Sequence, residues 1–163
     1  MKKLFVIYDC AAIEGRAAIV CTYDYLTERY RIFGDETMEE FRSIAENSLL
    51  VSYGGQTMQD DLLRSSGIEA ATYYDLYDAI LKAKDDNRRS DDYTLPLVAA
   101  ANYAGIAASR QTWHALWERG LCCQLADELL GDIAIVKRLM DRASSHGVIR
   151  DPVGAGWLAV RSP

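Results

Sequence analysis

Three strand-like segments follow one another at the start of the chain, and this succession limits the folds available to it. Residues 3–9, KLFVIYD, are apolar almost throughout, which is typical of a buried strand. Residues 17–25 and 28–34 form two further strand-like runs with a short turn at residues 26–27 between them. The turn predicts that these two runs pair as an antiparallel hairpin, so the chain should begin as an antiparallel three-stranded sheet.

Helical and strand-like segments alternate over the remainder of the chain. Asp35 and Gly67 are residue types that start and stop helices, and Asp75 should begin another helix after a short strand. The expected helices cover residues 36–47, 56–67, 75–84, 93–105, 111–119 and 121–147. The expected strands cover residues 48–55 and 69–74 and a tail at 156–161. This order predicts an α/β fold with a mixed central sheet and flanking helices, formed by a single domain over residues 1–163.

Charge and composition narrow the partners and the compartment. The net charge of −6 and the sequence pI near 4.9 argue against a broad nucleic-acid-binding surface, yet they allow a cleft that takes one nucleic-acid end. No apolar run is long enough to span a bilayer, and the start of the chain lacks the pattern of a signal peptide. The four cysteines lack zinc-site spacing and favour buried free thiols. We therefore expect a cytoplasmic protein that does not bind membranes.

The first strand-like run ends at Asp9, and this residue raises the question of a metal site. An aspartate delivered by a buried strand is a common metal ligand, and metal-dependent nucleases usually place a second acid two residues on. Here that position is Ala11. Asp9 alone is more simply read as a residue that ends a strand, so further acids are needed to favour a metal site.

Five motifs along the chain supply that context. After YDCA at the first strand come SYGGQTMQDDLL, YYDLYDAI, YTLPLVAAANYAG and ELLGDIAIVKRLMDRASSHGVI, in this order. In the spacing and framing of these motifs, residues 4 to about 150 resemble the DEDD superfamily of 3′–5′ exonucleases. The resemblance implies an RNase H-like fold, in which the strand over residues 3–9 is central, flanked by the strands over 17–25 and 48–53.

The resemblance also implies a site of four carboxylates that hold two Mg²⁺ or Mn²⁺ ions. Residue by residue, the first acid is Asp9 and the fourth is Asp132, and both would be catalytic residues and metal ligands. The second and third positions hold Ala11 and Gln59 instead of acids. Asp60 would be the third metal ligand after a shift of one residue. Other neighbouring acids are Asp61 and Glu14, and the general-base positions of the family hold Asp127 and Glu128.

Two functions remain open on these observations. In the first, the chain is a 3′–5′ exonuclease-like domain that processes single-stranded nucleic-acid ends. With two of the four acids replaced, its divalent-metal-dependent hydrolysis of phosphodiesters should be weak or absent. In the second, the chain keeps only the exonuclease fold and serves as an inactive binding or assembly module, as a homo-oligomer or with a protein partner.

Overall fold

The computed structural model describes residues 5–54, 59–86, 113–150, 157–161 and 163. The strands are β1 (Phe5–Ile13), β2 (Arg16–Asp24), β3 (Arg29–Phe33), β4 (Leu49–Ser52), β5 (Thr72–Asp75), β6 (Ile149–Arg150) and β7 (Trp157–Leu158). The helices are α1 (Met38–Glu46), α2 (Gln59–Ser65), α3 (Leu76–Asp86), α5 (Trp113–Glu118) and α6 (Cys122–His146), and a 3-10 turn, η1, covers Asp35–Thr37. The helix expected over residues 93–105 lies outside the described residues.

Five strands form a mixed sheet in the order β3-β2-β1-β4-β5. β1, β2 and β3 pair antiparallel, whereas β4 and β5 run parallel to β1. The antiparallel start and the central position of β1 between β2 and β4 confirm the expected α/β fold with the RNase H-like arrangement of strands. β1 is the strand at which the antiparallel part of the sheet, with β2 and β3, joins the parallel part, with β4 and β5.

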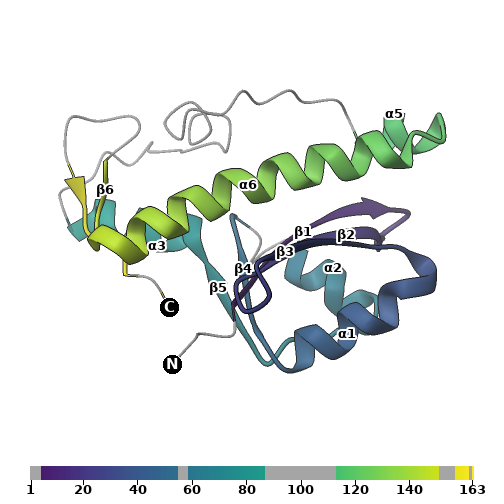
Figure 1. Ribbon diagram of the computed structural model, residues 1–163. Helices are drawn as coiled ribbons and strands as arrows, with labels where there is room; N and C mark the ends of the chain where they lie inside the picture. Colours follow the sequence, from purple (N-terminus) through teal and green to yellow (C-terminus); the bar gives the residue numbers. More distant parts are fainter. Residues whose placement is uncertain (1–4, 55–58, 87–112, 151–156, 162) are drawn as a thin grey trace.

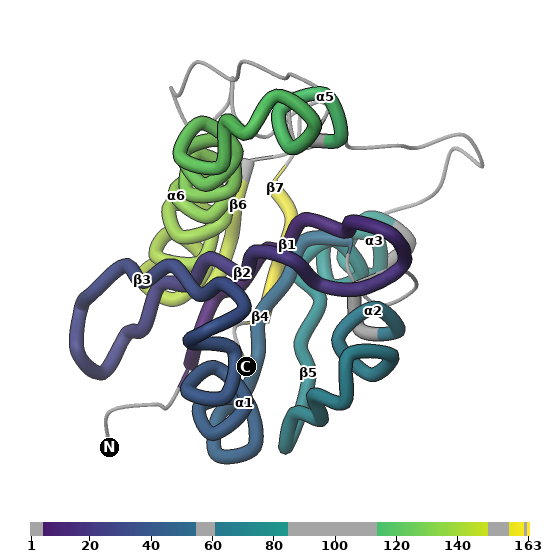
Figure 2. Tube along the Cα trace, turned by 90° about the vertical axis from the view of Figure 1, so that its right-hand side faces the viewer, coloured from purple at the N-terminus to yellow at the C-terminus, as the bar shows by residue number. Residues whose placement is uncertain are grey.

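Helices cover both faces of this sheet, so that two separate apolar layers hold the fold together (Figure 1). α6 crosses one face, and its buried residues pack with those of β1, β2 and α3. On the other face, α1 and α2 cover residues such as Val6 and Tyr8 of β1. Figure 2 shows α6 and α1 on opposite sides of the strands. Successive residues of β1 therefore point alternately to α6 and to the α1–α2 layer.

The first strand is longer than its sequence pattern indicates, and this moves Asp9 away from a strand end. β1 continues to Ile13 and pairs with β2 over this whole length, with an irregularity between Ala11 and Ala12. Pairing with the parallel neighbour β4 is recorded only as far as Ile7. Asp9 thus lies in the middle of β1 but beyond its last pair with β4. The expectation that the strand ends at Asp9 was wrong, because the hairpin with β2 supplies ladder hydrogen bonds on that side.

The start of one helix also differs from expectation, whereas the longest helix agrees with it. Asp35 does not cap an α-helix, because it opens the 3-10 turn that precedes α1. α6 spans 25 residues and ends where Gly147 adopts a left-handed conformation with φ of 67°. Among the helices described, none is both long and apolar enough to cross a membrane. The strand-like tail expected over residues 156–161 contains β7, which pairs antiparallel with β6 in a short second sheet.

Candidate active site

Asp9 lies on the face of the sheet that α6 covers. Ile7 and Ala11, two residues before and after it on β1, both belong to the apolar layer beneath α6. Residues at this spacing share a face of a strand, so Asp9 points to the same side. Its exposed fraction is 8%, and its Oδ1 atom accepts a hydrogen bond of 2.9 Å from the backbone N–H of Cys10. A carboxylate is therefore held in a largely apolar layer at the centre of the domain.

Cys21 of β2 lies directly opposite Asp9 in the antiparallel ladder. Its Sγ atom contacts the carbonyl oxygen of Ala126 at 3.8 Å, which joins β2 to α6. Burial, together with the negative charges of Asp9 and Asp127, raises the pKa of the Cys21 thiol to about 12. The carboxylates of Asp9 on the sheet and Asp127 on the helix thus act electrostatically on one buried thiol. The motifs of the sequence had not marked Cys21 as part of this site.

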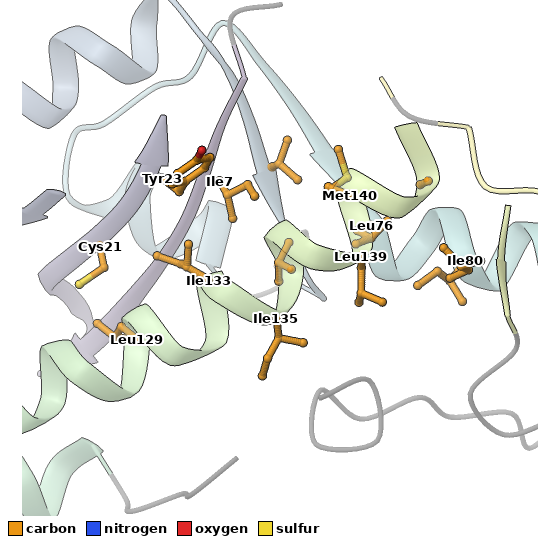
Figure 3. Packing of buried hydrophobic residues seen from close by; sticks show 14 of the residues in the cluster. Ile7, Cys21, Tyr23, Leu76, Ile80, Leu129, Ile133, Ile135, Leu139 and Met140 are labelled. Atoms are coloured by element: carbon orange, nitrogen blue, oxygen red, sulfur yellow. The ribbon is translucent and has the colours of Figure 1, made fainter. Parts of the chain in front are cut away.

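The position of Asp132 follows from the way in which α6 lies on the sheet. Figure 3 shows Leu129 and Ile133 pointing to the strands that carry Ile7 and Cys21. With about 100° between successive helical residues, Asp132 lies about 60° from Leu129 around the helix. It is half-buried, in keeping with a place at the edge of the sheet-facing stripe.

The side of α6 to which Asp132 turns can be read from its neighbours. Ala126 and Lys137 lie on the flank of α6 next to β2 and β3, since Ala126 contacts Cys21 and the Lys137 ammonium lies 4.9 Å from the ring centre of Tyr23. Helical periodicity puts Asp132 on the opposite flank, on the side of β1 and β4. Asp9 and Asp132 therefore come from facing elements, one on the covered face of β1 and the other on the covering helix.

Ala11, at the position of the second expected acid, is enclosed by the apolar layer. Its exposed fraction is 0%, and it belongs to the same cluster of buried side chains as Leu116 of α5 and the sheet-facing residues of α6. α5 packs against β1 as well as against α6. The residue at the position of the second expected acid is thus part of the hydrophobic core.

The acids that could replace the missing ligands lie in different surroundings. Asp60 is in the first turn of α2, and its side chain falls outside what the structure describes. Asp61 is exposed and accepts a hydrogen bond of 2.9 Å from Arg64, as an ordinary pair on the helix surface. Glu14 is exposed in the turn between β1 and β2, where its φ is 51°. Neither Asp61 nor Glu14 is part of the layer in which Asp9 lies.

Asp75, the aspartate of the YYDL motif, has a structural role at the end of β5. Its Oδ1 atom accepts hydrogen bonds from the backbone N–H groups of Gly54 and Tyr77, both at 2.8 Å, and lies 3.4 Å from that of Asp78. The carboxylate thus caps the start of α3 and holds the chain that leaves β4. This confirms the expectation that Asp75 begins a helix.

A pair of magnesium or manganese ions would need more carboxylates than the described residues group together here. Such ions need several carboxylate oxygens and water in octahedral shells. Within the described ranges, no three His, Cys, Asp or Glu residues are grouped so that they could hold a metal ion. Of the four positions in the exonuclease pattern, only Asp9 and Asp132 carry described carboxylates, and the buried side chain of Ala11 on β1 offers no oxygen.

Comparison with known proteins gives structural neighbours only. No protein-family model matches the chain, and no curated protein matches it. Among solved structures, it is similar to a crystal structure of the EXD2 exonuclease domain soaked in Mn and GMP, with 12% identity, a TM-score of 0.40, and coverage of 89% of this chain and 84% of that one. For the same domain soaked in Mg and GMP, the identity is 13%, the TM-score is 0.39, and the coverage is 86% and 78%.

Proposed function

We propose that the chain is an exonuclease-type domain that binds single-stranded nucleic-acid ends, and that its two-metal centre is incomplete, so that hydrolysis is weak or absent. The observation that carries this proposal is the placement of Asp9 and Asp132 on facing elements, β1 and α6. These are the elements that hold the first and last acids in the family that the chain resembles.

The proposed weakness of hydrolysis depends on Ala11 and Gln59. In a two-metal nuclease, one ion activates water and the other stabilises the leaving oxygen, and each contributes several kcal/mol, about three or more powers of ten in rate. Because the Ala11 side chain is fully buried, a water molecule at that point of the strand cannot take the place of the carboxylate as a metal ligand. We therefore assign the remaining carboxylates a role in positioning an end rather than in completing a metal pair.

A nuclease assay with matched variants tests this proposal. Single-stranded DNA and RNA, labelled at either end, would be incubated with the chain in Mg²⁺ or Mn²⁺, and binding would be followed by fluorescence anisotropy. Asp9→Asn and Asp132→Asn remove the proposed acids without changing side-chain size. Asp61→Asn is the matched control, because that aspartate is exposed and pairs only with a neighbour on α2.

We expect measurable binding of single-stranded ends, changed by Asp9→Asn and Asp132→Asn but not by the control, and little or no shortening of either strand. Rapid digestion that is lost in Asp9→Asn would show that the metal centre is complete. If neither DNA nor RNA binds, the role in nucleic-acid processing is wrong and only the fold is shared.

A further inference from the structure

The outer edge of the sheet at β3 carries an unusual concentration of exposed apolar side chains. Of the large apolar residues that are exposed in the described part of the chain, three of four lie on the β2–β3 hairpin: Leu26 at 44%, Tyr30 at 46% and Ile32 at 52%. Residues 29–32 of β3 are exposed on both faces of the sheet. In Figure 2 the end of this hairpin projects beyond the helices. Such an edge presents unpaired backbone groups to an incoming strand.

The two faces of β3 differ in chemistry. Tyr30 and Ile32 lie opposite Tyr23 and Cys21 of β2, so they extend the face that α6 covers. By the alternation of a strand, Arg29 and Arg31 point to the other face. Neither arginine forms an ion pair with any residue of the chain that the structure describes. The edge is therefore apolar on one side and carries two arginines on the other, with Asp24 of β2 opposite Arg29 in the ladder.

Contacts behind the edge hold it in place. The ring of Tyr30 packs on that of Tyr23, with 4.8 Å between ring centres, and Tyr23 packs edge-on against Tyr25 at 5.0 Å. The Tyr25 hydroxyl donates a hydrogen bond of 2.9 Å to Asp141 of α6, which also binds Lys137 at 2.6 Å. This tyrosine cluster ties the hairpin to the long helix. A strand added to β3 would thus meet a surface that is already ordered, which lowers the entropy lost on binding.

A second copy of the chain is a poor occupant of this edge. When two copies of a strand pair antiparallel about a two-fold axis, directly opposite residues share a face. In the central registers, Arg31 would then lie opposite Arg31 or Arg29 of the copy. Like charges directly opposite each other destabilise a sheet, and charged residues on an edge are a known barrier to self-association.

We propose that β3 accepts an extended segment of a protein partner in which acidic and apolar residues alternate. The backbone of that segment would complete the ladder, as in other cases of strand addition. Its acidic side chains would lie beside Arg29 and Arg31, and its apolar side chains beside Tyr30 and Ile32. This site goes beyond the proposed binding of nucleic-acid ends and does not depend on it.

The test uses the full chain and three short fluorescent peptides as probes. One peptide alternates glutamate and valine, the second alternates lysine and valine, and the third alternates glutamate and serine. The variant Arg29→Glu/Arg31→Glu reverses both charges of the edge at exposed positions. Arg119→Glu/Arg161→Glu makes the same change of net charge at exposed positions away from β3 and is the matched control.

We expect the glutamate–valine peptide to bind the wild type and to protect backbone amides of residues 29–33 from exchange. Charge reversal should weaken this binding at least about tenfold and favour the lysine–valine peptide, while the control variant binds as the wild type does. The glutamate–serine peptide should bind more weakly, because it lacks the apolar face.

Four results would overturn the proposal. The first is failure of the glutamate–valine peptide to bind the wild type, and the second is binding that the charge reversal leaves unchanged. The third is displacement of the peptide by single-stranded DNA, which would make the edge a nucleic-acid site. The fourth is a concentration-dependent dimer that is lost in Tyr30→Ser/Ile32→Ser, which would make a second copy the occupant.

Discussion

Introducing glutamate at Ala11 tests whether the second acid position has been absorbed into the hydrophobic core. The Cβ of Ala11 is fully buried, and Asp9 lies on the same face of β1, about 7 Å away at the spacing of a strand. A glutamate there would lose hydration and meet a like charge. Both effects raise the pKa of the new carboxyl, by about 3–5 units for a fully buried acid. Ala11→Gln is the matched control, because it has the same size and hydrogen-bonding shape without the charge.

The expected magnitude follows from linkage between protonation and folding. An exposed glutamate has a pKa of about 4.3, so pH 7 lies about 2.7 units above the pKa of this carboxyl in the unfolded chain. In the folded chain the carboxyl stays largely neutral at pH 7, so only the unfolded state gains free energy from ionisation. At about 1.4 kcal/mol per unit, Ala11→Glu should be about 4 kcal/mol less stable than Ala11→Gln at pH 7. For a chain of this size, that difference corresponds to a melting temperature lower by about 10 °C.

The sign of the pH dependence distinguishes this mechanism from simple overpacking. The pKa of the glutamate introduced at position 11 is raised in the folded chain. The glutamate and glutamine variants should therefore be equally stable below about pH 4, where this carboxyl is neutral in both the folded and the unfolded chain. The difference should grow as the pH rises until the folded pKa is reached. Urea unfolding at several pH values measures it. Equal stability of the two variants at pH 7 would refute the reasoning, because position 11 would then be open to water.

A second variant that includes Ala11→Glu tests whether the four acid positions of the exonuclease pattern can bind metal together. The double variant Ala11→Glu/Gln59→Asp restores acids at both replaced positions of the exonuclease pattern. If these positions face Asp9 and Asp132, Mn²⁺ at 100 times its dissociation constant should stabilise the double variant by about 2.7 kcal/mol. Thermal melts with and without Mn²⁺, with wild type and an added Asp9→Asn variant alongside, provide the measurement. If Mn²⁺ leaves the melting temperature of the double variant unchanged, the four positions do not share a cleft.

Three further outcomes are expected. Asp75→Ala should destabilise the fold by about 2 kcal/mol in urea unfolding, because it leaves part-buried backbone donors after β4 and at the start of α3 without their acceptor. Asp75→Asn should lose less, and equal stability of the alanine variant and the wild type would contradict the capping role. Tyr25→Phe should lose about 1 kcal/mol through its hydrogen bond to Asp141, and a thermal melt that matches the wild type would count against that bond. Cys10 and Cys21 are buried, and with its pKa near 12 the Cys21 thiol should be about one part in 10⁴ ionised at pH 8; native alkylation followed by mass spectrometry should therefore modify only the two exposed thiols at the start of α6, and rapid labelling of Cys21 would contradict its burial.

The order of the elements could be predicted from local patterns. Apolar runs and helical periodicity placed the first three strands, the alternation that follows them and the long helix at 122–146. These features depend on contacts between near neighbours in the chain, which is why they leave a periodic signature. The pattern also identified Asp75 as the residue that begins a helix, because a cap depends on backbone groups only a few residues away.

The extent of β1 and the surroundings of Asp9 could not be read in this way. An aspartate after an apolar run is a common place for a strand to end, yet the ladder with β2 carries β1 on to Ile13. Cys21 entered the surroundings of Asp9 only through strand register, and Ala126 and Asp127 only through the docking of α6 on the sheet. Register brings Cys21 opposite Asp9, and docking brings Cys21 to Ala126, 105 positions along the chain; no local pattern records either contact.

The sequence by itself determined that Ala11 and Gln59 stand at two of the four acid positions implied by the resemblance to the exonuclease motifs, since residue identity needs no coordinates. Only the tertiary structure decided what the replacement means at Ala11. The side chain of this β1 residue is enclosed by α5 and α6 rather than open to solvent. Burial depends on how separate elements pack over one another, and it makes position 11 a part of the hydrophobic core.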